Sequence, residues 1–133
     1  MTLSELYNYA EQRHIDIDNR KMRELVSAAF PENWIVLDRT KIPTSAEEKA
    51  ILAHEIGHCV TGAFYGVSSP PDFRAKQEQK ANEWAYRKLV PHDALLEAVK
   101  QGDSEIWQLA EHFGVPYDFM QHAVEYWRQI EAG

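Results

Sequence analysis

The sequence predicts a single α+β domain that is predominantly helical, with a small sheet and a C-terminal helical segment. The chain has 133 residues, which fits one domain, and 44% of them are hydrophobic, which is enough for a packed core. Several segments repeat apolar residues at helical spacing. The best strand candidate is Trp34–Leu37, which combines aromatic and β-branched residues.

The first third of the chain predicts two helices and a little extended structure. Apolar residues recur at helical spacing over about 2–13, and residues 15–18 alternate apolar and acidic side chains, as a short strand or extended connection would. A second helical pattern covers 22–29 and is closed by Pro31. We place Trp34–Leu37 as a strand at the edge of the sheet.

The remaining chain predicts helices separated by proline and glycine. A long helix should begin at Thr44 or Ser45 and run to about Gly62 or Gly66. After a segment rich in serine and proline, another long helix is expected over about 72–90. Three shorter helices should follow, near 92–101, 104–113 and 116–131.

Charge divides this single domain into a core region, 1–91, and an acidic helical tail, 92–133, packed on it. The core region holds 12 Lys or Arg against 13 Asp or Glu, whereas the tail holds two against eight. Such a tail would repel a phosphate backbone, so we expect no direct binding of nucleic acid. A pattern resembling a helix-turn-helix, from Ile106 to Phe119, is therefore interpreted as packing or as a docking site for protein.

The sequence also predicts a cytoplasmic protein without a membrane segment. No apolar run approaches the roughly 20 residues that a membrane-spanning helix needs. The N-terminus lacks the basic start and apolar stretch of a secretory signal. The only cysteine, Cys59, excludes an internal disulfide and suits a reducing compartment.

The clearest functional signal is the HEIGH segment, His54–His58, within the first long helix. Residues four apart lie on one helix face, so the two imidazoles can bind one ion. Glu55 lies on the flank of that face, where its carboxylate can reach a water on the ion without binding the ion. This is the HExxH pattern of zinc metallopeptidases. Without a third ligand, the same residues would equally fit a solvated helix face.

The next helix offers Glu78 and Glu83 as third ligands. Glu83 falls among basic residues on the outer face, whereas Glu78 shares a face with several alanines, where an uncompensated carboxylate would be unfavourable. We therefore expect Glu78 to bind the metal. Asn82 lies one turn further on the same face, and we expect it to accept the second ring N–H of a ligand histidine, preferably His54.

These motifs resemble the ImmA/IrrE family of zinc metallopeptidases, which are gluzincin-like HExxH enzymes. The resemblance rests on HEIGH, on EQKANEWA from Glu78 to Ala85, and on the Leu89-Val90-Pro91 ending, and it covers most of the chain. Departures are mild and replace no ligand: Ile56, Trp84, Lys88 and Val90. The resemblance implies a zincin-like core, metal ligands at His54, His58 and Glu78, and a catalytic glutamate at Glu55. It also implies that the substrate is a regulatory protein, often a helix-turn-helix repressor of a phage or mobile element.

The predicted function is that of a zinc-dependent, site-specific endopeptidase with one Zn²⁺ per chain, although other divalent metals fit such a site. Glu55 would act as the general base, and Tyr65, His92 or Tyr117 would supply an oxyanion donor, with no basis for choosing among them. An extended substrate would add as a strand beside Trp34–Leu37. The expected partner is a basic DNA-binding repressor, and no oligomeric state is predicted.

Two other functions compete with this interpretation. The first is a non-proteolytic, zinc-containing regulatory or antitoxin-like protein that binds a partner. An intact Glu55 beside three ligands favours the enzyme, because a structural zinc site usually closes with a fourth protein ligand. The second, a transcription factor, is disfavoured by the acidic tail.

Overall fold

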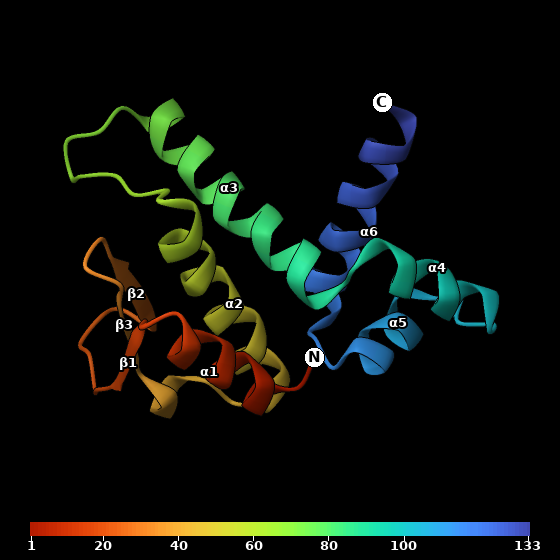
Figure 1. The fold of residues 1–133 in the computed structure, drawn as a ribbon, viewed down its shortest axis with the longest axis horizontal. Helices are drawn as coiled ribbons and strands as arrows, with labels where there is room; N and C mark the ends of the chain where they lie inside the picture. The colour runs from red at the N-terminus through yellow and green to blue at the C-terminus, as the bar shows by residue number, and fades with distance from the viewer.

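The computed structural model describes all 133 residues, which form six α-helices and a three-stranded sheet with the segments that connect them (Figure 1). The predominantly helical α+β class is thereby confirmed. None of the helices combines the length and the apolar composition that crossing a membrane requires. In chain order the elements are α1 (Leu3–Gln12), β1 (Asp16–Asn19), β2 (Ser27–Phe30), β3 (Trp34–Leu37), the 3₁₀ turn Arg39–Lys41, α2 (Ser45–Thr61), α3 (Pro71–Leu89), α4 (His92–Lys100), α5 (Ile106–Phe113) and α6 (Tyr117–Ala132).

The sheet corrects one expectation about strand position. Its order is β1-β3-β2, with β1 parallel and β2 antiparallel to β3. Trp34–Leu37 is therefore the central strand and cannot receive a further strand. The free edge on the side of α2 belongs to β2, because β2 pairs only with β3.

The helix expected over 22–29 is also wrong, because the end of that segment is strand β2. Side chains from elsewhere satisfy the backbone of the preceding residues. The Asp38 carboxylate accepts the Met22 N–H, and the Lys41 ammonium donates to the carbonyls of Met22 and Leu25. With those backbone groups taken, residues 27–30 pair with β3 instead of continuing a helical ladder.

Helices α2 and α3 form an antiparallel pair that runs beside the sheet (Figure 1). Thr44 caps the start of α2 by accepting the Glu47 N–H, and Gly62 ends it in the left-handed conformation. The two helices lie very close together at Gly57, where an added Cβ would lie 2.7 Å from the Ala81 carbonyl oxygen. Only glycine permits this approach without displacing a backbone.

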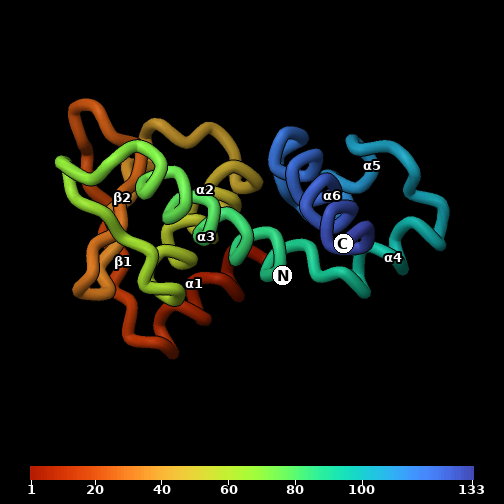
Figure 2. The backbone as a smooth tube through the Cα atoms, turned by 90° about the horizontal axis from the view of Figure 1, so that it is seen from above, coloured from red at the N-terminus to blue at the C-terminus, as the bar shows by residue number.

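The tail helices lie at the opposite end of the molecule from the sheet, and α3 leads from one end to the other (Figure 2). Hydrogen bonds from side chains to backbone carbonyls join the tail to the rest of the chain. The Trp127 indole donates to the Val90 carbonyl at 2.8 Å, and the buried Lys49 ammonium of α2 donates to the Phe113 carbonyl at 2.6 Å. One cluster of 19 buried hydrophobic residues extends through both regions.

Candidate metal centre

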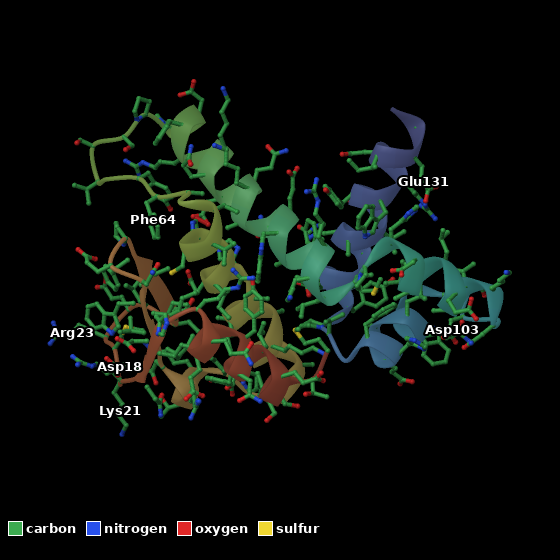
Figure 3. All side chains as sticks on the ribbon, viewed as in Figure 1. Asp18, Lys21, Arg23, Phe64, Asp103 and Glu131 are labelled. Carbon is green, nitrogen blue, oxygen red and sulfur yellow. The ribbon has the colours of Figure 1, made fainter.

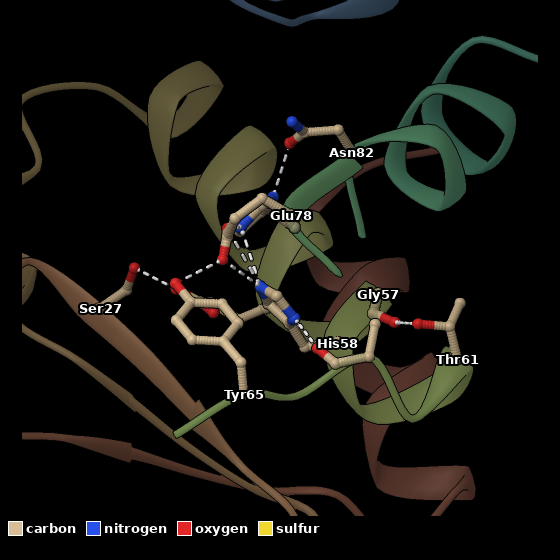
Figure 4. A network of polar contacts seen from close by, with 10 residues as sticks. Ser27, Gly57, His58, Thr61, Tyr65, Glu78 and Asn82 are labelled. Atoms are coloured by element: carbon tan, nitrogen blue, oxygen red, sulfur yellow. Dashed lines mark hydrogen bonds and ion pairs between the residues drawn. The ribbon is translucent and has the colours of Figure 1, made fainter. Parts of the chain in front are cut away.

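Three side chains from two helices converge on one point (Figure 4). His54 and His58, one turn apart on α2, bring their Nε2 atoms to 3.2 Å from each other. Glu78 of α3 lies against both, with Oε1 at 2.8 Å from His54 Nε2 and Oε2 at 3.2 Å from His58 Nε2. One ligand atom from each residue falls within 4.8 Å of the others.

The opposite ring nitrogens of the histidines hold the imidazoles in this orientation. His54 Nδ1 donates to Asn82 Oδ1 at 2.7 Å, and His58 Nδ1 donates to the Ala63 carbonyl at 2.5 Å. In the neutral form of each ring with its proton on Nδ1, each Nε2 presents its lone pair to the common point. Two lone pairs and a carboxylate facing one another are a donor set that fits a divalent metal ion.

The electrostatics of Glu78 agree with an ionised ligand. Partial burial raises the pKa of the Glu78 carboxyl, but His58, the Tyr65 hydroxyl and His54 outweigh that effect and hold the pKa below its usual value. The carboxylate is therefore available to a cation at neutral pH.

Glu55 lies beside this centre and is not part of it. Its side chain is buried, and its only hydrogen-bond partner on the chain is the Ser27 hydroxyl, which donates to Oε2 at 2.5 Å. The sequence does not predict this role of Ser27, because its helical spacing places residues 22–29 in a helix. The small residues Ser27-Ala28-Ala29, which let a strand lie close to α2, were the available signal.

Of the three proposed oxyanion donors, only Tyr65 reaches the centre. Its hydroxyl donates to Glu78 Oε2 at 3.0 Å. This hydrogen bond, with some desolvation, raises the pKa of Tyr65, so the phenol keeps its proton at neutral pH.

His92 and Tyr117 lie elsewhere. His92 pairs with Glu131 at 2.7 Å and stacks on Trp127, and Glu131 lies on the opposite side of the molecule from Phe64, which follows the HEIGH helix (Figure 3). Tyr117 is exposed at the start of α6 and lines neither of the cavities beside the metal centre.

Two cavities meet at the centre, and both are lined by Ser27 and His54. We call them together the cleft. One part, of about 600 Å³, lies between β2 and the loop after α2 and is lined by Leu25, Ser27, Ala28, Ala29, His54, Glu55, His58, Ala63, Phe64, Tyr65, Val67 and Glu78. The other, of about 520 Å³, extends toward α6 and is lined by Ser27, Glu47, Ala50, Ile51, His54, Asn82, Tyr86, Pro116, Asp118, Phe119 and His122.

Comparison with known proteins agrees with the geometry. Neither the curated proteins nor the solved structures contain a significant match. A family model, that of the IrrE N-terminal-like domain (Peptidase_M78), matches residues 10–125, which is most of the chain and includes α2, α3 and most of the tail. The resemblance seen in the sequence motifs is thus confirmed, and the chain belongs to the IrrE N-terminal-like family of metallopeptidases.

Proposed function

We propose that this protein is a zinc-dependent, site-specific endopeptidase whose substrate is a regulatory protein, such as a helix-turn-helix repressor of a phage or mobile element. The observation that carries the proposal is the convergence of His54, His58 and Glu78 beside a buried Glu55 in an open cleft. Three protein ligands leave a position for water, as catalytic zinc sites require.

The residues around the centre have distinct tasks in this proposal. When bound, zinc would polarise a peptide carbonyl and lower the pKa of a water toward about 7. Glu55 Oε1 has no partner on the chain, so we assign it to take the proton of the attacking water and to deliver it to the leaving amine. The protonated Tyr65 hydroxyl would donate to the negative charge that develops on the substrate oxygen.

The free edge of β2 is the proposed site for the substrate backbone. Ala28 and Ala29 of this strand line the cleft together with Glu55 and His58. An extended peptide that pairs with the unpaired edge would pass along the centre, and its main-chain hydrogen bonds would hold the scissile bond in place. The strand that pairs with an extended substrate is therefore proposed to be β2 and not Trp34–Leu37.

The charge of the cleft supports a basic partner. The part near α6 is lined by Glu47 and Asp118 and by no lysine or arginine. A neighbouring cavity of about 400 Å³ between α3 and α6 adds Glu83 and Glu125, again with no lysine or arginine. A DNA-binding repressor would present complementary charge, and nucleic acid itself would be repelled.

The decisive experiment compares the wild-type protein with Glu55→Gln. Both are loaded with zinc and incubated with purified candidate helix-turn-helix repressors, and the products are identified by mass spectrometry. We expect one discrete cleavage by the wild type and none by the variant, with equal zinc content. Cleavage by the variant would remove Glu55 from its assigned role. Partner binding without cleavage by the wild type would favour the non-proteolytic, antitoxin-like alternative.

A further inference from the structure

The hydrogen bond between Ser27 and Glu55 joins strand β2 to helix α2 inside the cleft. Ser27 belongs to β2, the strand whose edge is free for a substrate, and Glu55 belongs to the metal-binding helix α2. The Ser27 hydroxyl donates to Glu55 Oε2 and so links the strand to the helix.

No other group on the chain holds the Glu55 carboxylate. Glu55 is 7% exposed, and neither a backbone N–H nor a second side chain donates to it. A glutamate side chain has three rotatable bonds, and here one hydroxyl restrains its end. Since Ser27 engages Oε2, the carboxylate is held with Oε1 unpartnered.

From this geometry we propose that Ser27 is a positioning residue: it fixes the Glu55 carboxylate for proton transfer and ties that orientation to strand β2. The inference rests on the proposed function, because it assigns Ser27 a task only if Glu55 is the base. Ser27 forms no side-chain hydrogen bond with any of the three metal ligands, so its task is separate from metal binding.

The test uses the full chain loaded with zinc and a small probe, acetohydroxamate. This compound chelates zinc, and its hydroxyl proton can pass to a neighbouring carboxylate, so its affinity reports the placement of Glu55 without a peptide substrate. Calorimetry gives the Kd for the wild type, Ser27→Ala, Glu55→Gln and the double variant. Competition with a chromophoric chelator gives the zinc affinity of each.

We expect Ser27→Ala to weaken acetohydroxamate binding about tenfold, which corresponds to about 1.4 kcal/mol. We also expect no further weakening when Ser27→Ala is added to Glu55→Gln, because its effect passes through Glu55. Zinc affinity should stay within about twofold of the wild type. Equal weakening in both backgrounds would overturn the proposal, as would no effect of Ser27→Ala on the wild type.

Two further variants keep the proposal testable if Ser27→Ala fails to fold. Ser27→Thr retains the hydroxyl and suits a strand, so it should bind the probe as the wild type does. Ser27→Cys retains the size but donates weakly, so it should bind like a variant without the hydroxyl. Equal Kd values for these two would show that the hydroxyl does not matter.

Peptide kinetics provide a second readout that separates this proposal from the proposed function. With a peptide spanning the mapped cleavage site, Ser27→Ala should lower kcat about tenfold and leave KM unchanged. Failure of the wild type to bind zinc or to cleave would contradict the proposed function. Normal cleavage by Ser27→Ala would contradict only the role of Ser27.

Discussion

At the scale of single residues, Asn82 offers a contact whose effect on metal binding can be isolated. Its Oδ1 accepts the His54 Nδ1 proton and so orients the ring. Asn82→Ala should weaken zinc binding about 10–100-fold, because groups that orient ligand histidines contribute that much to affinity. Competition with a chelator measures it. Asn8→Ala, an exposed asparagine on α1, is the matched control, and an unchanged affinity in Asn82→Ala would contradict the assigned role.

Tyr65 can be tested in the same way against Tyr117, since only Tyr65 reaches the centre. Tyr65→Phe should lower kcat about a hundredfold while zinc stays bound, because it removes one donor to the developing oxyanion. Tyr117→Phe should cleave at the wild-type rate. The assignment fails if the two variants have equal rates in a cleavage assay on the mapped peptide.

Sequence reasoning was informative for residues whose spacing lies within one helix or between neighbouring helices. His54, His58, Glu78 and Asn82 lie on helix faces that periodicity defines, and the structure brings all four together. Ser27 was missed because its hydrogen bond to Glu55 joins a strand and a helix, and the two residues are 28 positions apart in the sequence. The periodicity of residues within one element cannot reveal a contact between elements that far apart in the sequence.

At the scale of elements, the contact between α2 and α3 determines the geometry of the metal centre. Gly57→Ala would place a methyl group 2.7 Å from the Ala81 carbonyl oxygen, and a backbone cannot yield as a flexible side chain can. We expect a loss of about 1–3 kcal/mol in the free energy of unfolding, typical of overpacking. We also expect weaker zinc binding, because α3 carries Glu78.

Urea denaturation and chelator competition would measure both effects. Gly66→Ala is the control, since an added Cβ there would meet only the Ser69 hydroxyl, at 4.0 Å. A Gly57→Ala protein as stable as the wild type would mean that the two helices can separate without loss.

The stability of the protein should depend on pH through Asp38, which follows β3 and whose carboxylate holds the loop before β2. Hydrogen bonds from the Thr40 hydroxyl and the Met22 N–H hold the pKa of Asp38 below its usual 3.8. A lowered pKa means that the stabilisation is present above that usual value and is lost as the pH falls through the folded-state pKa. Asp38→Asn should therefore be less stable than the wild type at pH 7, and the difference should shrink below about pH 4.

Urea unfolding at pH 7, 5 and 3 would follow this difference in stability, and a difference that stays constant with pH would show that Asp38 does not act through its charge.

Asp38 also helps to explain why the helix expected over 22–29 was wrong. The helical spacing was present, but Asp38 and Lys41, up to 19 positions away, take the backbone groups that a helix would have used.

At the scale of the whole molecule, the tail contributes to the same core as helices α2 and α3. Eight of the 19 residues in the core cluster belong to it: Leu95, Ala98, Leu109, Ala110, Val115, Met120, Ala123 and Val124. We therefore predict that a fragment ending at Pro91 will not fold, because it would expose the apolar surface that these residues cover.

Circular dichroism and chemical denaturation of the fragment would test this prediction. A cooperative transition at the wild-type denaturant concentration would mean that 1–91 is an independent domain. The charge distribution predicts a boundary between core region and tail, but charge describes the surface and contains no information on shared packing. The buried contacts between the two regions became visible only in the folded chain.

The free edge of β2 has a consequence for the dynamics of any protein substrate. A chain can pair with that edge only when it is extended, and a segment held in a helix has already used its backbone groups. A folded substrate would be cut only while its target segment is locally unfolded, so the cleavage rate would follow the population of that open state. Mutations that stabilise the substrate far from the scissile bond would then protect it without touching the enzyme.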